Sequence, residues 1–359
     1  MKDKAKAGRC WCGSDALKVF SEHYSRCESC NTLVCRLRMP EEFYRGEDNS
    51  KSFYGKEYWT SYVKEGLGFQ DIFERSRADL AERCIYWLRA ILKYKLPPAA
   101  TLELGCAHGG LVFLMKLAGY DASGAEMSRW ICDFAEKTFA VPMLCGRIED
   151  FSASPGTYDT IVLMDVLEHM TDPAGSVRKI AGALKDNGII VIQTPCWREM
   201  EKTYEEMKAH QSIFIPMFQE KEHLYLFNKS SLRKLLETEG FRYIEFEPHI
   251  FPYDMFVFAC RQPLKAADEE AVSAELLKRP ESRVVLALMD IFEKMELKNR
   301  LLTESESDRK ARFDQIQELT ALAKAAQEEV RRVSGYPEVR ARRILSGIFK
   351  KLLHRDKKI

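Results

Sequence analysis

The 359-residue sequence predicts an α/β protein built on a doubly wound, mostly parallel seven-stranded sheet. Two observations favour this fold class. Short apolar runs alternate with amphipathic helical patterns from residue 101 to residue 261, as in parallel sheets with crossover helices. A cysteine-rich segment precedes this region, and a Glu-, Lys- and Ala-rich stretch without any strand pattern follows it. We therefore expect a sheet domain with a small N-terminal element and an α-helical C-terminal arm.

The sheet should contain five parallel strands followed by an antiparallel pair. The pair is expected to be antiparallel because a turn through Pro248 and Pro252 joins its two strands. The predicted strands span residues 101–104, 122–125, 142–144, 159–164, 188–193, 243–247 and 255–260. In a doubly wound sheet the ligand crevice lies at the carboxyl ends of the parallel strands.

Composition divides the chain into four parts. Residues 8–40 hold the cysteines, and residues 41–98 hold an aromatic segment followed by a helical pattern. We interpret this second part as a helical lid. Residues 99–262 contain the predicted sheet, and residues 265–359 form the arm.

The bulk composition excludes several classes of protein. The net charge of +1 gives no general attraction to nucleic acid, so no nucleic-acid partner is expected. No uninterrupted apolar run approaches about 18 residues, and the first residues lack the apolar stretch of a signal peptide. Eleven cysteines without an export signal favour a reducing compartment. We therefore expect a cytoplasmic protein.

A glycine-rich turn follows the first predicted strand. Gly105, Ala107 and Gly110 keep this turn small, and the helix behind it offers backbone N–H donors to a ligand. Glu126, 21 residues after Gly105, is suited to bind two ribose hydroxyls. Taken alone, this pattern fits a nicotinamide dinucleotide as well as other nucleoside cofactors.

Four segments then resemble the successive motifs of class I S-adenosylmethionine-dependent methyltransferases. They are LELGCAHGG at 102–110, GAEMS at 124–128, DVLEHM at 165–170 and LKDNGIIVIQTP at 184–195. Their order and spacing are most similar to those of the ubiquinone-type O-methyltransferases. The resemblance covers roughly residues 50–262. It implies a Rossmann-like methyltransferase fold with S-adenosylmethionine as cofactor.

The resemblance also implies cofactor contacts. The methionine part would contact Glu103, Gly105 and Gly109, the ribose Glu126, and the adenine Ile148 and Glu149, with Asp165 at the mouth of the pocket. The full set of implied cofactor-binding residues is Glu103, Gly105, Ala107, Gly109, Glu126, Met127, Ile148, Glu149 and Asp165. Arg147 departs from the pattern, because many relatives carry there an acid that faces the adenine amine.

Four side chains are candidates for the transfer step. Asp165, Glu168 and His169 are spaced i, i+3 and i+4, so they would share one face of a helical turn, and His223 comes from another loop. Three interpretations stay open. His169 or His223 is a general base, or all four bind a divalent ion that lowers the pKa of the acceptor hydroxyl, as in some relatives. Otherwise Glu168 and His169 only brace the turn.

Cys10, Cys12, Cys27 and Cys30 form two close pairs separated by 14 residues. This spacing predicts a structural zinc site in a zinc-ribbon-like element that needs the metal to fold. The first pair is C-x-C rather than C-x-x-C, so Cys35 is an alternative ligand. Similar N-terminal elements occur on related methyltransferases tied to sugar or cell-surface polysaccharide pathways.

The arm carries two helical patterns. Residues 281–333 predict long helices that either fold back on the sheet domain or form a homodimer seam. In the last pattern, Ile344, Leu345, Ile348, Phe349, Leu352 and Leu353 share one face, and Arg343, Lys350 and Lys357 lie opposite. A basic amphipathic helix of this kind predicts peripheral membrane contact, packing on the protein's own surface, or an RNA-binding tail.

These features predict a methyltransferase that modifies a hydroxyl of a small molecule or of a nucleotide- or lipid-linked sugar, such as a polysaccharide precursor. Two alternatives are kept. A nicotinamide oxidoreductase would share the glycine turn but would leave the segment 165–169 unexplained. A non-catalytic methyltransferase fold could instead serve as an assembly subunit. Acceptor specificity would lie in the loops at 40–68 and 196–222.

Overall fold

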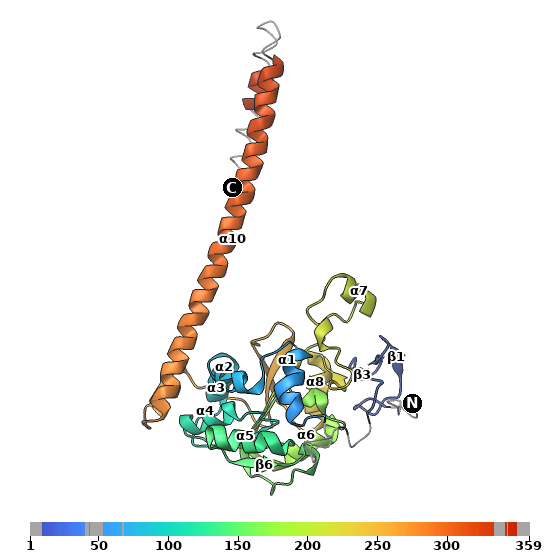
Figure 1. The fold of residues 1–359 in the computed structure, drawn as a ribbon, viewed down its shortest axis with the longest axis vertical. Coiled ribbons are helices and arrows are strands. Elements are labelled where there is room, and N and C mark those ends of the chain that lie inside the picture. Colours follow the sequence, from blue (N-terminus) through green and yellow to red (C-terminus); the bar gives the residue numbers. More distant parts are fainter. Residues whose placement is uncertain are drawn as a thin grey trace. The chain divides into compact units, whose positions relative to one another are not determined.

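The computed structural model describes residues 9–39, 43, 53–66, 68–333, 342 and 344–349. The chain divides into two compact units, Met1–Phe292 and Glu293–Ile359. The whole sheet domain lies in the first unit (Figure 1).

The central sheet has seven strands in the order β10-β11-β8-β7-β4-β5-β6. In chain order they are β4 (Ala100–Leu104), β5 (Asp121–Glu126), β6 (Met143–Cys145), β7 (Tyr158–Met164), β8 (Leu184–Pro195), β10 (Tyr243–Glu247) and β11 (Asp254–Cys260). Strands β4 to β8 pair in parallel, and β11 is antiparallel to both β8 and β10. The predicted fold class is confirmed. Strand β8 starts four residues earlier than predicted, at Leu184.

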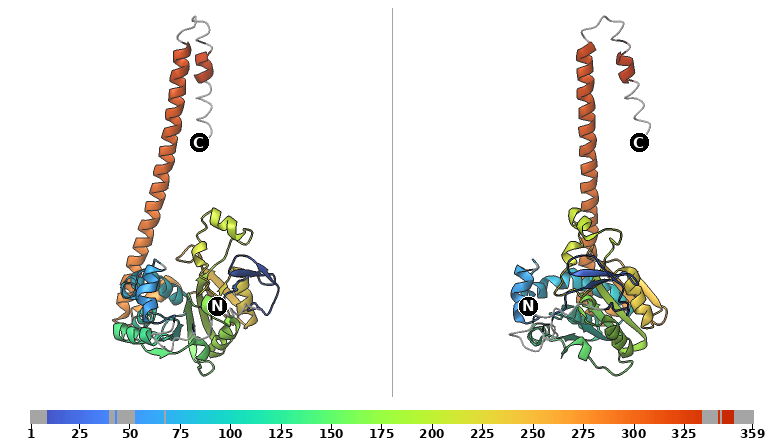
Figure 2. Two further views of the ribbon diagram at one scale, coloured as in Figure 1. Left: turned by 45° about the vertical axis from the view of Figure 1, so that its right-hand side comes forward. Right: turned by 90° about the vertical axis from the view of Figure 1, so that its right-hand side faces the viewer.

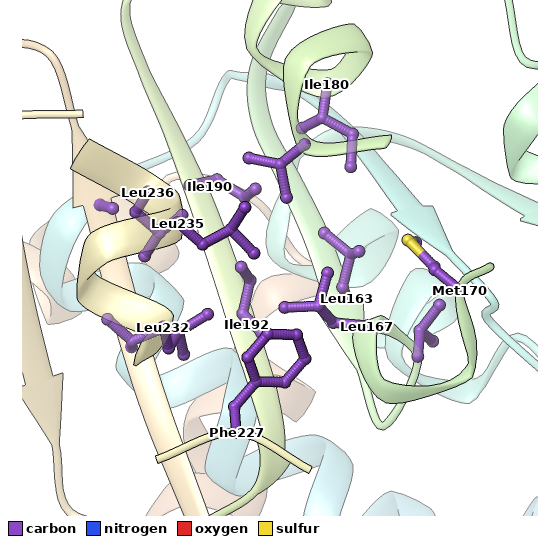
Figure 3. Packing of buried hydrophobic residues seen from close by; sticks show 14 of the residues in the cluster. Leu163, Leu167, Met170, Ile180, Ile190, Ile192, Phe227, Leu232, Leu235 and Leu236 are labelled. Atoms are coloured by element: carbon purple, nitrogen blue, oxygen red, sulfur yellow. The ribbon is translucent and has the colours of Figure 1, made fainter. Parts of the chain in front are cut away.

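Both faces of the sheet are apolar, which explains why its strands read as continuous apolar runs. Successive side chains of a strand point to opposite faces, so Leu163 and Ile192 join one core while Val162 and Val191 join the other. Figure 3 shows the first core, where α8 and Ile180 of α6 cover Leu163, Ile190 and Ile192.

Helices cover both faces of this sheet. One core includes side chains of α6 (Pro173–Ala183) and α8 (Lys229–Thr238), and the other includes those of α3 (Ile85–Tyr94), α4 (Gly110–Ala118), α5 (Arg129–Phe139) and α9 (Glu269–Leu276). Side chains of Asp172 and Asn228 cap the first turns of α6 and α8. The shorter helices are α1 (Val63–Glu65), α2 (Ile72–Asp79), α7 (Tyr204–Ala209), η4 (Ile148–Asp150), η5 (Leu167–His169) and η6 (Ile215–Met217).

Two short segments of the predicted helical lid are π-helical. They are η2 (Tyr58–Tyr62) and η3 (Leu80–Cys84), and η3 separates α2 from α3. A π-turn inserts one residue into the helical repeat and therefore re-aims the side chains around it. Phe73 of α2 is 54% exposed and contacts Trp130 and Phe134.

The N-terminal cysteine-rich segment forms a second, four-stranded sheet. Its order is β1-β2-β3-β9, where β1 is Leu17–Val19, β2 is Tyr24–Cys27 and β3 is Leu33–Cys35. The fourth strand, β9 (Tyr225–Leu226), comes from the sheet domain and pairs antiparallel with β3. The N-terminal element is thus built into the first unit.

The arm begins within the first unit. Helix α10 (Ser282–Val333) is one continuous helix of 52 residues (Figure 2). Near its start Val285 is buried, and the Ser282 hydroxyl donates to the Leu117 carbonyl. In the second unit Phe313 and Ile316 are exposed. Among the described helices, none is both long and apolar enough to cross a membrane.

The last amphipathic pattern is only partly described. Residues 344–349 are helical, with Leu345 and Phe349 exposed. Its remaining predicted positions, Arg343, Lys350, Leu352, Leu353 and Lys357, lie outside the described residues.

Candidate active site

Two adjoining cavities open at the carboxyl ends of β4, β5 and β7. Their volumes are about 460 Å³ and about 160 Å³. Tyr58, Trp59, Gly105, Asp165 and His169 line both. These five residues therefore mark the junction at which a molecule in one cavity would meet a molecule in the other.

The glycine turn after β4 adopts left-handed backbone conformations. Gly105 has a φ of 68°, and a Cβ there would lie 2.5 Å from Cγ2 of Val166. Gly109, with a φ of 79°, is the residue before the first turn of α4. Both positions require glycine, because a side chain would be strained at either one. Ala107 also adopts a positive φ, of 45°.

Glu126 ends β5 beside this turn and lines the smaller cavity together with Met127 and Ile148. Its buried carboxylate accepts backbone N–H groups of Met127 at 2.8 Å and of Ala107 at 3.3 Å. Burial raises the pKa of Glu126, and these amides oppose the rise. Arg147 lines the same cavity. Glu149 lies in η4, and its side chain is outside the described part of the structure.

Glu103 lies on the larger cavity and is 4% exposed. Its Oε2 has no hydrogen-bond partner within the described residues. Burial, followed by the charge of Glu126, raises the pKa of Glu103 to about 8. A buried carboxyl without a partner is costly, so this position is suited to a ligand that brings a positive charge.

Three predicted residues meet on the larger cavity, and one of them, His169, also lines the smaller one. One ligand atom each from Glu168, His169 and His223 lies within 4.8 Å of the others. The Nδ1 of His169 donates to the Glu222 carbonyl at 3.0 Å, and the Nδ1 of His223 donates to the Met217 carbonyl at 2.7 Å. Because a carbonyl only accepts, each Nδ1 carries the proton and each Nε2 carries a lone pair.

Only one oxygen of the Glu168 carboxylate has a hydrogen-bond partner among the described residues. Oε2 of Glu168 accepts from the Thr194 hydroxyl at 2.9 Å, whereas Oε1 is buried without a partner in the described part of the chain. Burial, with the nearby charge of Asp165, raises the pKa of Glu168 well above its ordinary value. Burial also lowers the pKa of His169 to about 3 and that of His223 to about 4. Both imidazoles are therefore neutral near pH 7.

Two imidazole nitrogens and one carboxylate oxygen fit a divalent ion. The neutral rings present lone pairs, and each is oriented by a carbonyl on its other nitrogen, as is usual for metal-bound histidine. The unpartnered Oε1 of Glu168 supplies the anionic ligand. The residues present therefore fit the metal interpretation.

Asp165 does not share a helical face with Glu168 and His169. It has a φ of 57° between β7 and η5, so the helical turn begins only after it and the expected i, i+3, i+4 arrangement is wrong. Nε2 of Gln193 donates to both carboxylate oxygens of Asp165, at 3.1 Å and 3.2 Å. The three-residue ligand group does not include it. Strained backbone of this kind is common at functional sites.

A buried ion-pair network on the lid was not predicted. Asp79, 3% exposed, contacts Nε of Arg75 at 3.1 Å and Nε of Arg83 at 3.3 Å. Asp79 also accepts a hydrogen bond from Nε2–H of His108 at 3.0 Å. The other ring nitrogen of His108, Nδ1, accepts from the Gly110 N–H. This chain of bonds ties the lid to the first turn of α4. The i, i+4 spacing of Arg75, Asp79 and Arg83 was the signal available in the sequence.

Asp254 was also missed. It begins β11, is 1% exposed, and neither of its carboxylate oxygens has a partner among the described residues. It lines the larger cavity. Burial, with the charges of Asp165 and Glu168, raises the pKa of Asp254 to about 9. No sequence pattern distinguishes it from an ordinary turn aspartate.

The four predicted zinc ligands also come together. The sulfurs of Cys10, Cys12, Cys27 and Cys30 lie within 4.8 Å of one another. The Cys10–Cys30 and Cys12–Cys27 sulfur distances are 3.5 Å and 3.6 Å, close to the ~3.8 Å edge of a tetrahedron with Zn–S bonds of about 2.3 Å. These thiols fit zinc.

The alternative ligand is not needed. Cys35 lies outside the cluster, and its thiol contacts the carbonyls of Leu37 and Glu220. Burial raises the pKa of Cys35 to about 11, whereas the neighbouring Cys10 thiol lowers that of Cys30 to about 5.

Comparison with known proteins agrees with the geometry. Residues 76–245 match a family described as "Methyltransferase domain". Ubiquinone biosynthesis O-methyltransferase of Xanthomonas campestris is 30% identical over 105 residues, which are 28% of this chain and 44% of that protein. The Bordetella pertussis protein of the same name is 32% identical over 106 residues, or 26% and 41% of the two chains. This chain thus matches less than half the length of these curated relatives.

Parts of this chain are also similar to solved structures. A putative O-methyltransferase from Nostoc punctiforme has a TM-score of 0.43 at 13% identity, covering 52% of this chain and 59% of that one. Magnesium protoporphyrin IX methyltransferase from Synechocystis, with bound SAH, has a TM-score of 0.41 at 16% identity, covering 58% and 98%.

The strand order and the glycine turn define a Rossmann-like nucleotide-binding domain. The match over residues 76–245, together with the curated O-methyltransferase relatives, supports a class I S-adenosylmethionine-dependent methyltransferase domain.

Proposed function

We propose that this protein transfers the methyl group of S-adenosylmethionine to a hydroxyl oxygen, with a divalent ion held by Glu168, His169 and His223. The observation that carries the proposal is the meeting of three suitable ligand atoms within 4.8 Å of one another on the larger cavity, with His169 also lining the smaller one. A hydroxyl acceptor is the kind of acceptor that gains most from such an ion, which lowers its pKa when bound.

The side chains favour the ion over a histidine base. An efficient general base has a pKa near the working pH. The pKa values of His169 and His223 are lowered to about 3 and about 4 by burial, so neither ring would hold an abstracted proton well. The bracing interpretation accounts for the bond from Thr194 to Glu168 but leaves the other oxygen of Glu168 without a role.

The two cavities give the substrates separate places. The smaller one, lined by Glu126, Met127 and Ile148, would take the adenosine, and Glu103 would meet the ammonium group of the methionine part. The sulfonium methyl would then lie near Gly105, with Tyr58 and Trp59 excluding water over the junction. Positioning of this kind accounts for much of the acceleration of a displacement reaction.

The larger cavity favours a polar, ring-shaped acceptor. Aromatic residues Trp87, Phe251 and Tyr253 line it together with Arg83 and the unpartnered carboxyl of Asp254. Flat apolar faces combined with buried polar groups suit a sugar ring or a hydroxylated aromatic ring. We propose a small-molecule or sugar hydroxyl, including precursors of polysaccharides. The four N-terminal cysteines would hold a structural zinc ion, because four thiolates leave no open coordination position.

A methylation assay tests the proposal. The protein would be incubated with S-adenosylmethionine and a panel of catechols, free sugars and nucleotide-linked sugars, and S-adenosylhomocysteine would be quantified. We expect turnover with at least one hydroxyl acceptor, loss of turnover in a weak chelator, and recovery with Mg²⁺ or Mn²⁺. Cofactor binding without turnover on any acceptor would instead favour a non-catalytic assembly subunit. The cysteine cluster should keep its zinc throughout, which metal analysis checks.

A further inference from the structure

The N-terminal element and the predicted ligand His223 are physically joined. Strand β3 pairs with β9, through Leu33 with Leu226 and Val34 with Tyr225. Strand β9 begins two residues after His223. The sheet that carries the cysteines is therefore continuous with the segment that carries a candidate active-site histidine.

Tyr24 makes the most direct connection. It is 1% exposed, and its hydroxyl donates to the His223 carbonyl at 2.8 Å. Its ring packs edge-on against Phe218 with 5.2 Å between centroids. Phe218 follows Met217, whose carbonyl holds Nδ1 of His223. Tyr24 thus touches both the backbone of His223 and the residue after the group that orients its imidazole.

A second path runs through the backbone. The Cys35 N–H donates to the Leu224 carbonyl at 2.9 Å, and the Leu224 N–H donates to the Glu168 carbonyl at 2.8 Å. These two bonds link the end of β3 to η5, which carries Glu168 and His169. His223 and Glu168 are therefore tied to the N-terminal sheet by one and by two hydrogen bonds, and His169 follows Glu168 directly in the chain.

The N-terminal residues of both paths lie close in sequence to the cysteine cluster. Cys27 is the last residue of β2, three residues after Tyr24, and Cys30 lies in the turn that leads to β3. A sheet of three- and four-residue strands is at best marginally stable by itself. A metal that joins Cys27 and Cys30 to Cys10 and Cys12 would fix this hairpin, because small elements of this kind depend on the ion to fold.

We propose that the zinc-ribbon-like element is a positioning element for the active site, which acts through Tyr24 and the β3–β9 pairing to hold His223 against Glu168 and His169. This inference rests on the proposed function for its catalytic consequence. Its structural consequence does not depend on that function: the segment 217–228 is ordered only while the cysteine cluster is intact.

Hydrogen–deuterium exchange on the full-length protein tests this structural consequence. Tyr24→Phe keeps the ring and removes only the donor, and Cys27→Ser with Cys30→Ser removes two ligands. We expect peptides within 217–228 to exchange several-fold faster in the first variant and at least tenfold faster in the second, with 100–118 unchanged. The matched control is Tyr120→Phe, another buried tyrosine whose hydroxyl donates to a backbone carbonyl, that of Lys95, away from the site. Unchanged exchange over 217–228 in Tyr24→Phe overturns the inference.

Manganese titration tests the consequence for the site. With zinc in place, Tyr24→Phe should bind Mn²⁺ about tenfold more weakly than wild type and Tyr120→Phe equally well, while both keep wild-type affinity for S-adenosylmethionine. Wild-type Mn²⁺ affinity in Tyr24→Phe would contradict the positioning role. Absence of Mn²⁺ binding in the wild type, together with faster exchange in Tyr24→Phe, would instead show that the ribbon orders the loop and that the proposed ion site is wrong.

Discussion

The indole Nε1–H of Trp87 donates to Oε1 of Gln193 at 2.8 Å, and this bond decides which end of the Gln193 amide faces Asp165. With its oxygen held by Trp87, Gln193 presents its NH₂ group to both carboxylate oxygens of Asp165. A residue of lid helix α3 therefore sets the hydrogen bonding of a residue at the active-site junction.

Removal of this donor should destabilise the fold. Trp87→Phe leaves the buried Gln193 oxygen unpaired and makes a small cavity, so we expect a loss of about 2–4 kcal/mol in the free energy of unfolding. Urea denaturation measures this loss. Trp130→Phe is the control, because no hydrogen bond of the Trp130 indole occurs in the described structure. Equal losses in the two variants would mean that the Trp87 bond contributes nothing specific.

Glu126→Gln should weaken cofactor binding. The substitution keeps the shape of the side chain but removes the charge that strengthens hydrogen bonds from two ribose hydroxyls, and we expect a loss of tenfold or more, equivalent to about 1.4 kcal/mol or more. Calorimetric titration with S-adenosylhomocysteine measures the change. Wild-type affinity in this variant would remove Glu126 from the cofactor site.

Cofactor affinity should also depend on the ionisation of Glu103. Its pKa in the free protein is raised to about 8, and a bound ammonium group would favour the charged form. Binding must therefore release a proton below pH 8. We expect affinity for S-adenosylmethionine to rise up to about tenfold per pH unit between about pH 5.5 and 7, below the range in which the ligand's amine titrates. The slope should be lost in Glu103→Gln. A pH-independent wild type would mean that Glu103 keeps its proton when the cofactor binds.

Asp254→Asn should stabilise the fold at neutral pH. The pKa of Asp254 is raised from 3.8 to about 9 on folding, so the folded chain binds a proton that the unfolded chain has lost, and stability falls as pH rises between these values. The variant lacks this penalty, so its advantage over wild type should be near zero at pH 4. This advantage should then grow by up to about 1 kcal/mol per pH unit, and by less to the extent that the ionisation of Asp254 is coupled to that of Asp165 and Glu168. Denaturation of the two proteins without added divalent ions, at pH 4, 6 and 8, measures this advantage, and a constant difference would contradict the raised pKa.

The sheet could be predicted because its strands are buried on both faces and therefore read as unbroken apolar runs. The glycine turn could be predicted because the fold requires glycine there: a side chain at Gly105 would meet Val166. Asp165 was misplaced because its positive φ depends on tertiary structure, and an aspartate carries no local signal for it. The pairing of β3 with β9 was not foreseen, because a two-residue strand has no periodicity to detect.

The most direct test of the proposed ion site is the stoichiometry of Mn²⁺ binding, which electron paramagnetic resonance measures on the zinc-loaded protein. We expect one Mn²⁺ per chain in the wild type and none in His223→Gln or Glu168→Gln, with affinity for S-adenosylmethionine unchanged in both variants. Equal Mn²⁺ binding in the wild type and in His223→Gln, or no binding in either protein, would contradict the ion site and leave the two histidines as structural braces.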